Sequence, residues 1–142
     1  MQIKNTSGYV GKNGVTANKV EGDYCTLSGL YSLGFGFGTE PIDTEIEYRI
    51  INCDCYWVDD INSLNYNQWV ESKNITWNSA EHLIDHPQSY HYGIVINYNT
   101  NPVIANKGSA IFLHCSNGNY TAGCVSMPID TMKDIEGYSR LD

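Results

Sequence analysis

The chain of 142 residues contains few charged side chains, and fewer basic than acidic ones. Charged residues make up 17% of it, below the usual ~25%, so we expect neither a disordered tail nor a coiled coil. Eight basic residues against sixteen acidic ones give a formal net charge of −8. Binding to DNA, RNA or an anionic membrane surface needs a basic stripe. We therefore expect no nucleic-acid partner and no polyanionic partner.

Long apolar runs are also missing. The first twenty residues contain none, so we expect no signal peptide there, no membrane-spanning helix and no membrane insertion. Two interpretations stay open: a cytoplasmic protein, or a catalytic domain cut from a longer exported chain. The strand-like segment 8–14 lies almost at the start, which favours the second interpretation and a truncated N-terminal edge.

Good helix formers are scarce as well. Ala and Leu together occur 12 times, whereas Ile occurs 14, Asn 15, Gly 13 and Tyr 11 times. β-Branched and aromatic residues suit strands, and Gly and Asn suit turns. A chain of this length forms one domain and can bury a core without a metal or a disulfide. The composition therefore predicts a single, mostly β domain over residues 1–142.

Local patterns predict three strands and two short helices. Alternating apolar residues indicate strands over 45–55, 90–98 and 109–115. A helix is expected over 78–85, where Asn78 is the cap and Glu81 closes a capping box. A second helix is expected over 128–138, where Ile129, Met132 and Ile135 recur at helical spacing.

Cysteine and histidine spacings do not predict a metal site. The five cysteines form an odd number, and the spacing of Cys53 and Cys55 matches neither a zinc knuckle nor a thioredoxin motif. We expect these two side chains on one face of a strand, as small buried residues of a reduced protein. His82 and His86 are four residues apart with His91 nearby, but the glutamate of an HExxH motif is absent. We interpret them as a solvated helix face and expect no metal and no cofactor.

One segment, residues 108–125, combines a strand, a polar turn and a return that contain a histidine and a cysteine. If the return pairs symmetrically about Asn119, His114 faces Cys124, with Cβ atoms ~4.5–5.5 Å apart. An imidazole at that distance takes the thiol proton, and the resulting thiolate–imidazolium pair can attack a carbonyl group. Backbone amides around Gly123 and Cys124 are then placed to bind an oxyanion. A buried cysteine beside an unrelated surface histidine is the alternative.

Strand alternation separates the two neighbouring thiols. It places Ala110, Phe112 and His114 on one face and Ile111, Leu113 and Cys115 on the other. We therefore predict that Cys115 is a core residue although it follows the proposed base.

These residues resemble the active-site segment of the L,D-transpeptidase family, the YkuD-like catalytic domain. That family has a histidine followed by a Ser/Thr-x-Gly-Cys motif, which His114 and Thr121-Ala122-Gly123-Cys124 match. The resemblance extends over about residues 9–136 and includes the run 108–114, and the combined order of the matched segments is more specific than any one of them. The chain departs from the usual motif where Ala122 replaces a second histidine and Ser126 replaces an arginine, and the interval from histidine to cysteine is short.

The resemblance implies a β-sandwich or barrel-like catalytic domain that acts on peptidoglycan stem peptides. Cys124 would attack the carbonyl of the third residue, release D-alanine and pass the acyl group to an amine of another stem, making a 3-3 cross-link. His114 would carry the proton, and the Cys115 carbonyl would orient its ring. It implies donor and acceptor stem peptides as partners, an extracytoplasmic location and no cofactor. We expect a monomer.

The same resemblance suggests substrate-binding residues, each with a structural alternative. Asp59 and Asp60 would hold a cationic side chain or form a turn, and Tyr92, like Tyr66 and Trp69, would line a cleft or fill the core. Ser109 and Thr121 lie close to the proposed nucleophile in the chain. Two other functions stay open: an L,D-carboxypeptidase that trims the same stems, and a non-catalytic β-sandwich that binds the cell wall.

Overall fold

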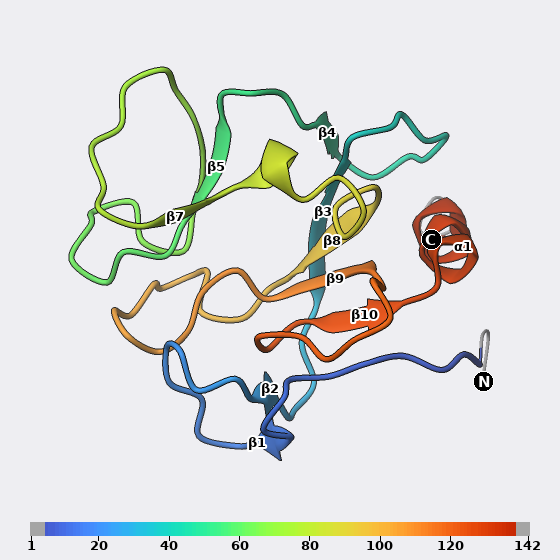
Figure 1. Ribbon diagram of the computed structural model, residues 1–142, viewed down its shortest axis with the longest axis horizontal. Coiled ribbons are helices and arrows are strands. Elements are labelled where there is room, and N and C mark those ends of the chain that lie inside the picture. The colour runs from blue at the N-terminus through green and yellow to red at the C-terminus, as the bar shows by residue number, and fades with distance from the viewer. Residues whose placement is uncertain (1–4, 139–142) are drawn as a thin grey trace.

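The computed structural model describes residues 5–138 and is mostly β, as the composition predicts. Three sheets and a C-terminal helix make up the fold (Figure 1). In chain order the elements are β1 (Val15–Thr16), β2 (Thr26–Leu27), β3 (Leu33–Gly38), β4 (Tyr48–Ile50), β5 (Cys55–Val58), β6 (Trp69–Glu71), β7 (Ala80–His82), the 3-10 turn η1 (Leu83–Asp85), β8 (Gly93–Ile96), β9 (Phe112–Cys115), β10 (Val125–Met127) and α1 (Ile129–Tyr138). No helix in this part of the chain has the length and apolar character that a membrane span needs.

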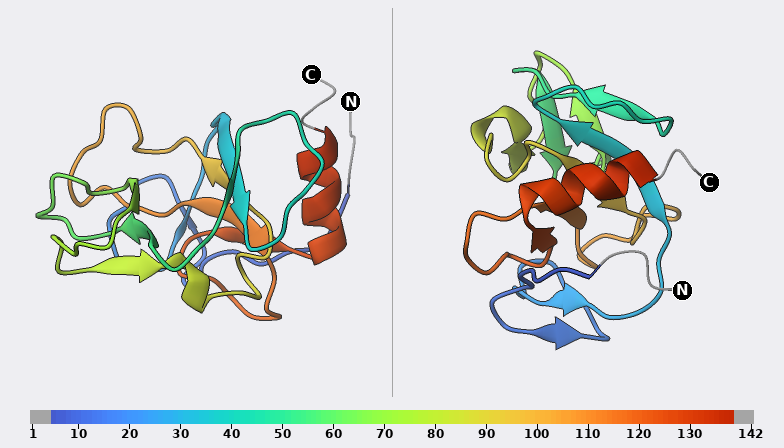
Figure 2. Two further views of the ribbon diagram at one scale, coloured as in Figure 1. Left: turned by 90° about the horizontal axis from the view of Figure 1, so that it is seen from above. Right: turned by 90° about the vertical axis from the view of Figure 1, so that its right-hand side faces the viewer.

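A five-stranded sheet in the order β10-β9-β8-β3-β4 lies at the centre. β8 pairs antiparallel with β3 and β9, whereas β4 and β10 add to the edges in parallel. Figure 2 (left) shows β5 and β7 on one side of this sheet and α1 on the other. The central sheet therefore separates two cores.

The first core lies between the central sheet and the β6-β5-β7 sheet. Phe112 packs edge-on against Phe37 and Trp57, with ring centroids 4.9 Å apart in each pair. Leu83 and Val95 close the same cluster. Edge-to-face packing of buried rings stabilises such a core beyond the area that it buries.

The second core lies under α1 and contains Ile94, Cys115, Met127 and Met132. Successive residues of a strand point to opposite faces, which is why Ile94 lies here while its neighbour Val95 lies in the first core. The predicted helix over 128–138 is present as α1, and the predicted core residue Cys115 is confirmed at 2% exposed.

The predicted helix over 78–85 is wrong. Residues 80–82 form β7, which pairs antiparallel with β5, and only Leu83–Asp85 make a helical turn. The backbone N–H of Asn78 donates to Asp60 Oδ2 at 2.9 Å, so Asn78 belongs to a loop contact. Strand pairing with β5 supplies hydrogen bonds that a two-turn helix cannot match.

The strand predicted over 45–55 is interrupted. It divides into β4 and β5 around a turn, which leaves Cys53 exposed while Cys55 is buried. The two thiols therefore do not share a face, and the expected burial is wrong for Cys53. Segment 8–14 makes single bridges from Tyr9 and Gly11 rather than a strand.

Candidate active site

Cys124 and His114 lie on neighbouring chain segments, but the return is not a hairpin. β9 and β10 pair in parallel, with Ser126 opposite His114. The connection over 116–124 therefore runs back along β9 before β10 begins. The prediction of a directly opposed pair symmetric about Asn119 is wrong.

The Cys124 thiol lies near the start of β9. Its Sγ donates to the Ala110 carbonyl oxygen at 3.0 Å and accepts from the Phe112 N–H at 3.4 Å. The parallel register places Cys124 beside Phe112, two residues before His114, and residues two apart on a strand share a face. Cys124 packs against the first core, to which Ala110 and Phe112 belong. The thiol and the imidazole are thus diagonal neighbours on one face of the sheet.

Two contacts hold the buried His114 imidazole. Its Nδ1 lies 2.9 Å from the Cys115 carbonyl oxygen, the contact that the resemblance implies. When Nδ1 donates this bond, Nε2 is the basic nitrogen. The Tyr90 ring lies edge-on at 5.5 Å between centroids. Burial lowers the pKa of His114 below its ordinary 6.5, so the ring is neutral at neutral pH and can accept a proton.

The thiol is also neutral in this state. Burial, together with the nearby Glu81 carboxyl, raises the pKa of Cys124 to about 12, while the Phe112 N–H and Lys19 act in the opposite direction. Within residues 5–138 the thiol makes its hydrogen bonds to the backbone of Ala110 and Phe112 and none to the imidazole. The thiolate–imidazolium pair expected from the sequence is therefore not the resting state.

The turn before β10 is held by hydroxyl groups. Gly123 has φ of +143°, where a side chain would be strained. Thr121 Oγ1 accepts the Gly123 N–H at 3.0 Å and donates to the Cys124 carbonyl oxygen at 2.6 Å. The Thr26 hydroxyl donates to the Gly123 carbonyl oxygen at 3.0 Å. Because Thr121 takes the Gly123 N–H, the expectation that this amide binds an oxyanion is wrong, and Gly123 serves the turn.

Both groups line one cavity of about 370 Å³. Six of the site residues proposed from the sequence belong to its wall, namely Asp59, Ser109, His114, Thr121, Gly123 and Cys124. A space of this size accommodates part of a small ligand or peptide. The structure thus brings together the nucleophile, the base and three of the predicted substrate-binding residues.

Asp60 and Tyr92, which were also predicted to bind substrate, lie outside the cavity wall. Asp60 accepts backbone N–H bonds from Asn62 and Asn78, both at 2.9 Å, and these bonds lower the pKa of its carboxyl group. It organises a loop, while its neighbour Asp59 lines the cavity. Tyr92 is buried in the second core, under α1. Neither Asp60 nor Tyr92 lines the cavity that contains Cys124 and His114.

The cavity wall also contains acidic side chains, of which Glu81 was expected from the sequence to have a capping or a substrate-binding role. Glu81 projects from β7 and accepts a hydrogen bond from the Tyr90 hydroxyl, and burial raises its pKa to about 7. Glu21 accepts from Tyr66 Oη at 2.7 Å and from Ser109 Oγ at 2.5 Å. The sequence pattern of a capping box predicted Glu81 at the start of a helix, whereas the structure places it on β7 in the cavity wall.

An asparagine supports the strained backbone beside the thiol. Ala110 has φ of +55°, unusual for a residue with a side chain. Asn67 Oδ1 accepts the Ala110 N–H at 3.0 Å and the Trp57 Nε1–H at 2.9 Å. Its amide donates to the Asn99 carbonyl oxygen at 2.7 Å. This network aims the Ala110 carbonyl at Cys124.

The three histidines near η1 make separate contacts: His86 packs edge-on against Tyr90 in the cavity wall, and His91 packs against Tyr92. His82 stacks on Tyr56 and bonds to Asp85 and to the Cys53 carbonyl oxygen. No group of three metal-ligating side chains occurs in the part of the chain that the structure describes.

Comparisons of the chain with family models, with curated proteins and with solved structures find no match. The chemistry of the site therefore rests on its own residues.

Proposed function

We propose that the protein catalyses cysteine-dependent acyl transfer on peptidoglycan stem peptides, with Cys124 as nucleophile and His114 as base. The observation that carries the proposal is the shared cavity, in which a thiol and a neutral, backbone-oriented imidazole lie on one face of the central sheet. The stem-peptide substrate and the sandwich-like L,D-transpeptidase fold come from the sequence resemblance.

Acylation starts from the neutral pair. His114 Nε2 accepts the Sγ proton while Sγ attacks the carbonyl carbon of the third stem residue. The S–C bond forms, the C–N bond to D-alanine breaks, and His114 returns the proton to the leaving amine. The product is a thioester on Cys124.

An amine from a second stem resolves the thioester. It attacks the same carbonyl carbon, its proton passes through His114 to the leaving sulfur, and a 3-3 cross-link results. Water in place of the amine yields a trimmed tripeptide, the carboxypeptidase reaction. Stem peptides lie outside the cytoplasmic membrane, so the proposal also places the protein there.

The test is incubation of the protein with purified tetrapeptide muropeptides, with products identified by mass spectrometry. We expect cross-linked dimers, and at least a roughly 1,000-fold loss of product in Cys124→Ala and in His114→Gln. Cys115→Ala is the matched control, because it removes a thiol outside the cavity wall and should retain turnover. Tripeptides without dimers would replace transfer by hydrolysis. No Cys124-dependent product would overturn the proposal.

A further inference from the structure

Lys19 is a buried lysine that reaches the turn containing Cys124. Its side chain is 3% exposed, and lysines are almost never buried without a purpose or a partner. A Cβ atom placed on Gly123 would lie 3.2 Å from Lys19 Nζ, so the ammonium contacts the residue before the nucleophile. Lys19 also lines the cavity that contains the thiol.

Two glycines make room for the lysine. A Cβ atom on Gly108 would lie 3.1 Å from Lys19 Cγ, and one on Gly123 would meet Nζ and Cε. Both glycines have positive φ, +115° and +143°. The Lys19 stem thus passes between the segment that leads into β9 and the turn that leads into β10, and this fixes where its charge lies.

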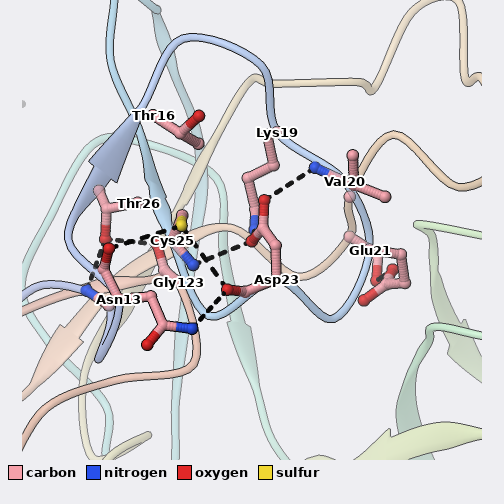
Figure 3. Close-up of polar contacts among 12 residues, drawn as sticks. Asn13, Thr16, Lys19, Val20, Glu21, Asp23, Cys25, Thr26 and Gly123 are labelled. Carbon is pink, nitrogen blue, oxygen red and sulfur yellow. Dashed lines mark hydrogen bonds and ion pairs between the residues drawn. The ribbon is translucent and has the colours of Figure 1, made fainter.

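Asp23 forms an ion pair with the Lys19 ammonium. Lys19 Nζ lies 2.6 Å from Asp23 Oδ1, and Asp23 also accepts the N–H groups of Val20 and Cys25 at 2.9 Å each. Figure 3 shows this loop with Thr26 and Gly123 alongside. In the part of the chain that the structure describes, Lys19 lines the cavity and Asp23 does not. The positive end of the ion pair therefore faces the site.

The site needs a positive group at this place. Attack by Cys124 converts a carbonyl oxygen into an oxyanion, which enzymes stabilise with preorganised donors. The Gly123 N–H is already bonded to Thr121 Oγ1, and Glu21, Asp59 and Glu81 make the rest of the wall unfavourable to negative charge. Among the described residues that line the cavity, Lys19 is the one lysine or arginine.

We propose that the Lys19 ammonium, held by Asp23, stabilises the oxyanion that forms at Cys124. Lys19 keeps its proton throughout and donates a hydrogen bond to the oxygen, so no covalent bond to it forms or breaks. The proposal rests on the proposed function, because the oxyanion arises only when Cys124 attacks a carbonyl group.

The test compares two reactions of the same thiol in Lys19→Met. Muropeptide turnover forms an oxyanion, whereas alkylation of Cys124 by iodoacetamide does not. We expect kcat to fall about 100-fold and alkylation to slow by no more than about tenfold, since alkylation senses only the effect of Lys19 on the thiolate. Lys12→Met is the matched control, because Lys12 is an exposed lysine that precedes β1 and lies over Tyr120. Equal losses in the two reactions, or no loss of turnover, would overturn the proposal.

A double variant separates charge from folding. Lys19→Met leaves Asp23 unpaired, whereas Lys19→Met/Asp23→Asn removes both charges and should restore the thermal unfolding midpoint. Its turnover should stay about 100-fold low. Recovery of turnover would mean that Lys19 only neutralises Asp23 and would overturn the oxyanion role. Absence of turnover in the unsubstituted protein would overturn the proposed function as well, while an active Lys19→Met would overturn this inference alone.

Discussion

The two faces of the central sheet contain the same kinds of residue in different settings. Toward β5 the chain places a cysteine, Cys124, and a carboxyl group, Glu81. Toward α1 it places Cys115 and Glu136. Burial raises the pKa of both thiols, and it raises the pKa of Glu81 to about 7 and of Glu136 to about 8.

Access and hydrogen bonding distinguish the two faces. Cys124 and Glu81 line a cavity, and Glu81 has the Tyr90 hydroxyl as a partner. Glu136 is 0% exposed, and in the described part of the chain neither of its carboxyl oxygens has a hydrogen bond. A perturbed pKa by itself therefore does not identify a reactive site here, whereas a perturbed group beside open space does.

The largest expected effect concerns the two thiols. In the folded protein iodoacetamide should label Cys124 at least about 1,000-fold faster than Cys115, because Cys115 becomes accessible only when the structure opens. Peptide fragmentation by mass spectrometry locates each label, and the exposed Cys53 serves as the internal standard for reagent activity. Comparable labelling of Cys115 and Cys124 would remove the distinction between the faces.

Glu136 should make the fold less stable as the pH rises. Its carboxyl group ionises near the ordinary 4.5 in the unfolded chain, but burial raises its pKa to about 8 in the fold, where Tyr48, Tyr92 and Cys115 lie near it. The unfolded chain thus binds fewer protons between these values, and stability falls across that range by about 2–4 kcal/mol.

Urea unfolding of Glu136→Gln from about pH 5 to pH 9 checks this, since the amide cannot ionise. As the pH rises, the free energy of unfolding should fall less for the variant than for the unsubstituted protein. Glu81 is present in both proteins and contributes equally to both pH profiles. Glu45→Gln is the control, because Glu45 is exposed and the change should leave the curve in place. Parallel curves for Glu136→Gln and the unsubstituted protein would contradict the assignment.

The smallest effect concerns two tyrosines on the two faces. Tyr90→Phe removes the hydroxyl that bonds to Glu81 but keeps the ring against His114. We expect the free energy of unfolding to fall by about 1–2 kcal/mol and turnover to change by less than about threefold. Tyr92→Phe should alter stability by less than about 0.5 kcal/mol, because none of the described hydrogen bonds uses its hydroxyl. Urea titration measures both. A greater loss for Tyr92→Phe would reverse the ranking of the faces.

Local pattern was sufficient where a feature depends on neighbours in the chain. The mostly β composition, the helix after Pro128 and the division of β9 into a Phe112 face and a Cys115 face all follow from propensity and period. The resemblance to a family motif named His114, Cys124, Ser109 and Thr121, and these four residues line one cavity.

Local pattern failed where a distant partner decides. Residues 78–85 carry a capping-box spacing, but pairing with β5 makes residues 80–82 a strand. The polar turn after Cys115 suits a hairpin, but the return pairs in parallel, so Ser126 rather than Cys124 lies opposite His114. A turn sequence restricts the local backbone angles, but it does not specify whether the returning segment pairs with the preceding strand in parallel or antiparallel.

The sequence by itself determined the chemical groups of this protein: a β-rich chain with a thiol, an imidazole and a glycine turn close together near its end. Only the tertiary structure decided their environment. It places Lys19 against Gly123 and Glu81 in the cavity wall, and it buries Glu136, a residue of α1. The physical reason is that charge, burial and access depend on contacts between residues far apart in the chain, which no local period encodes.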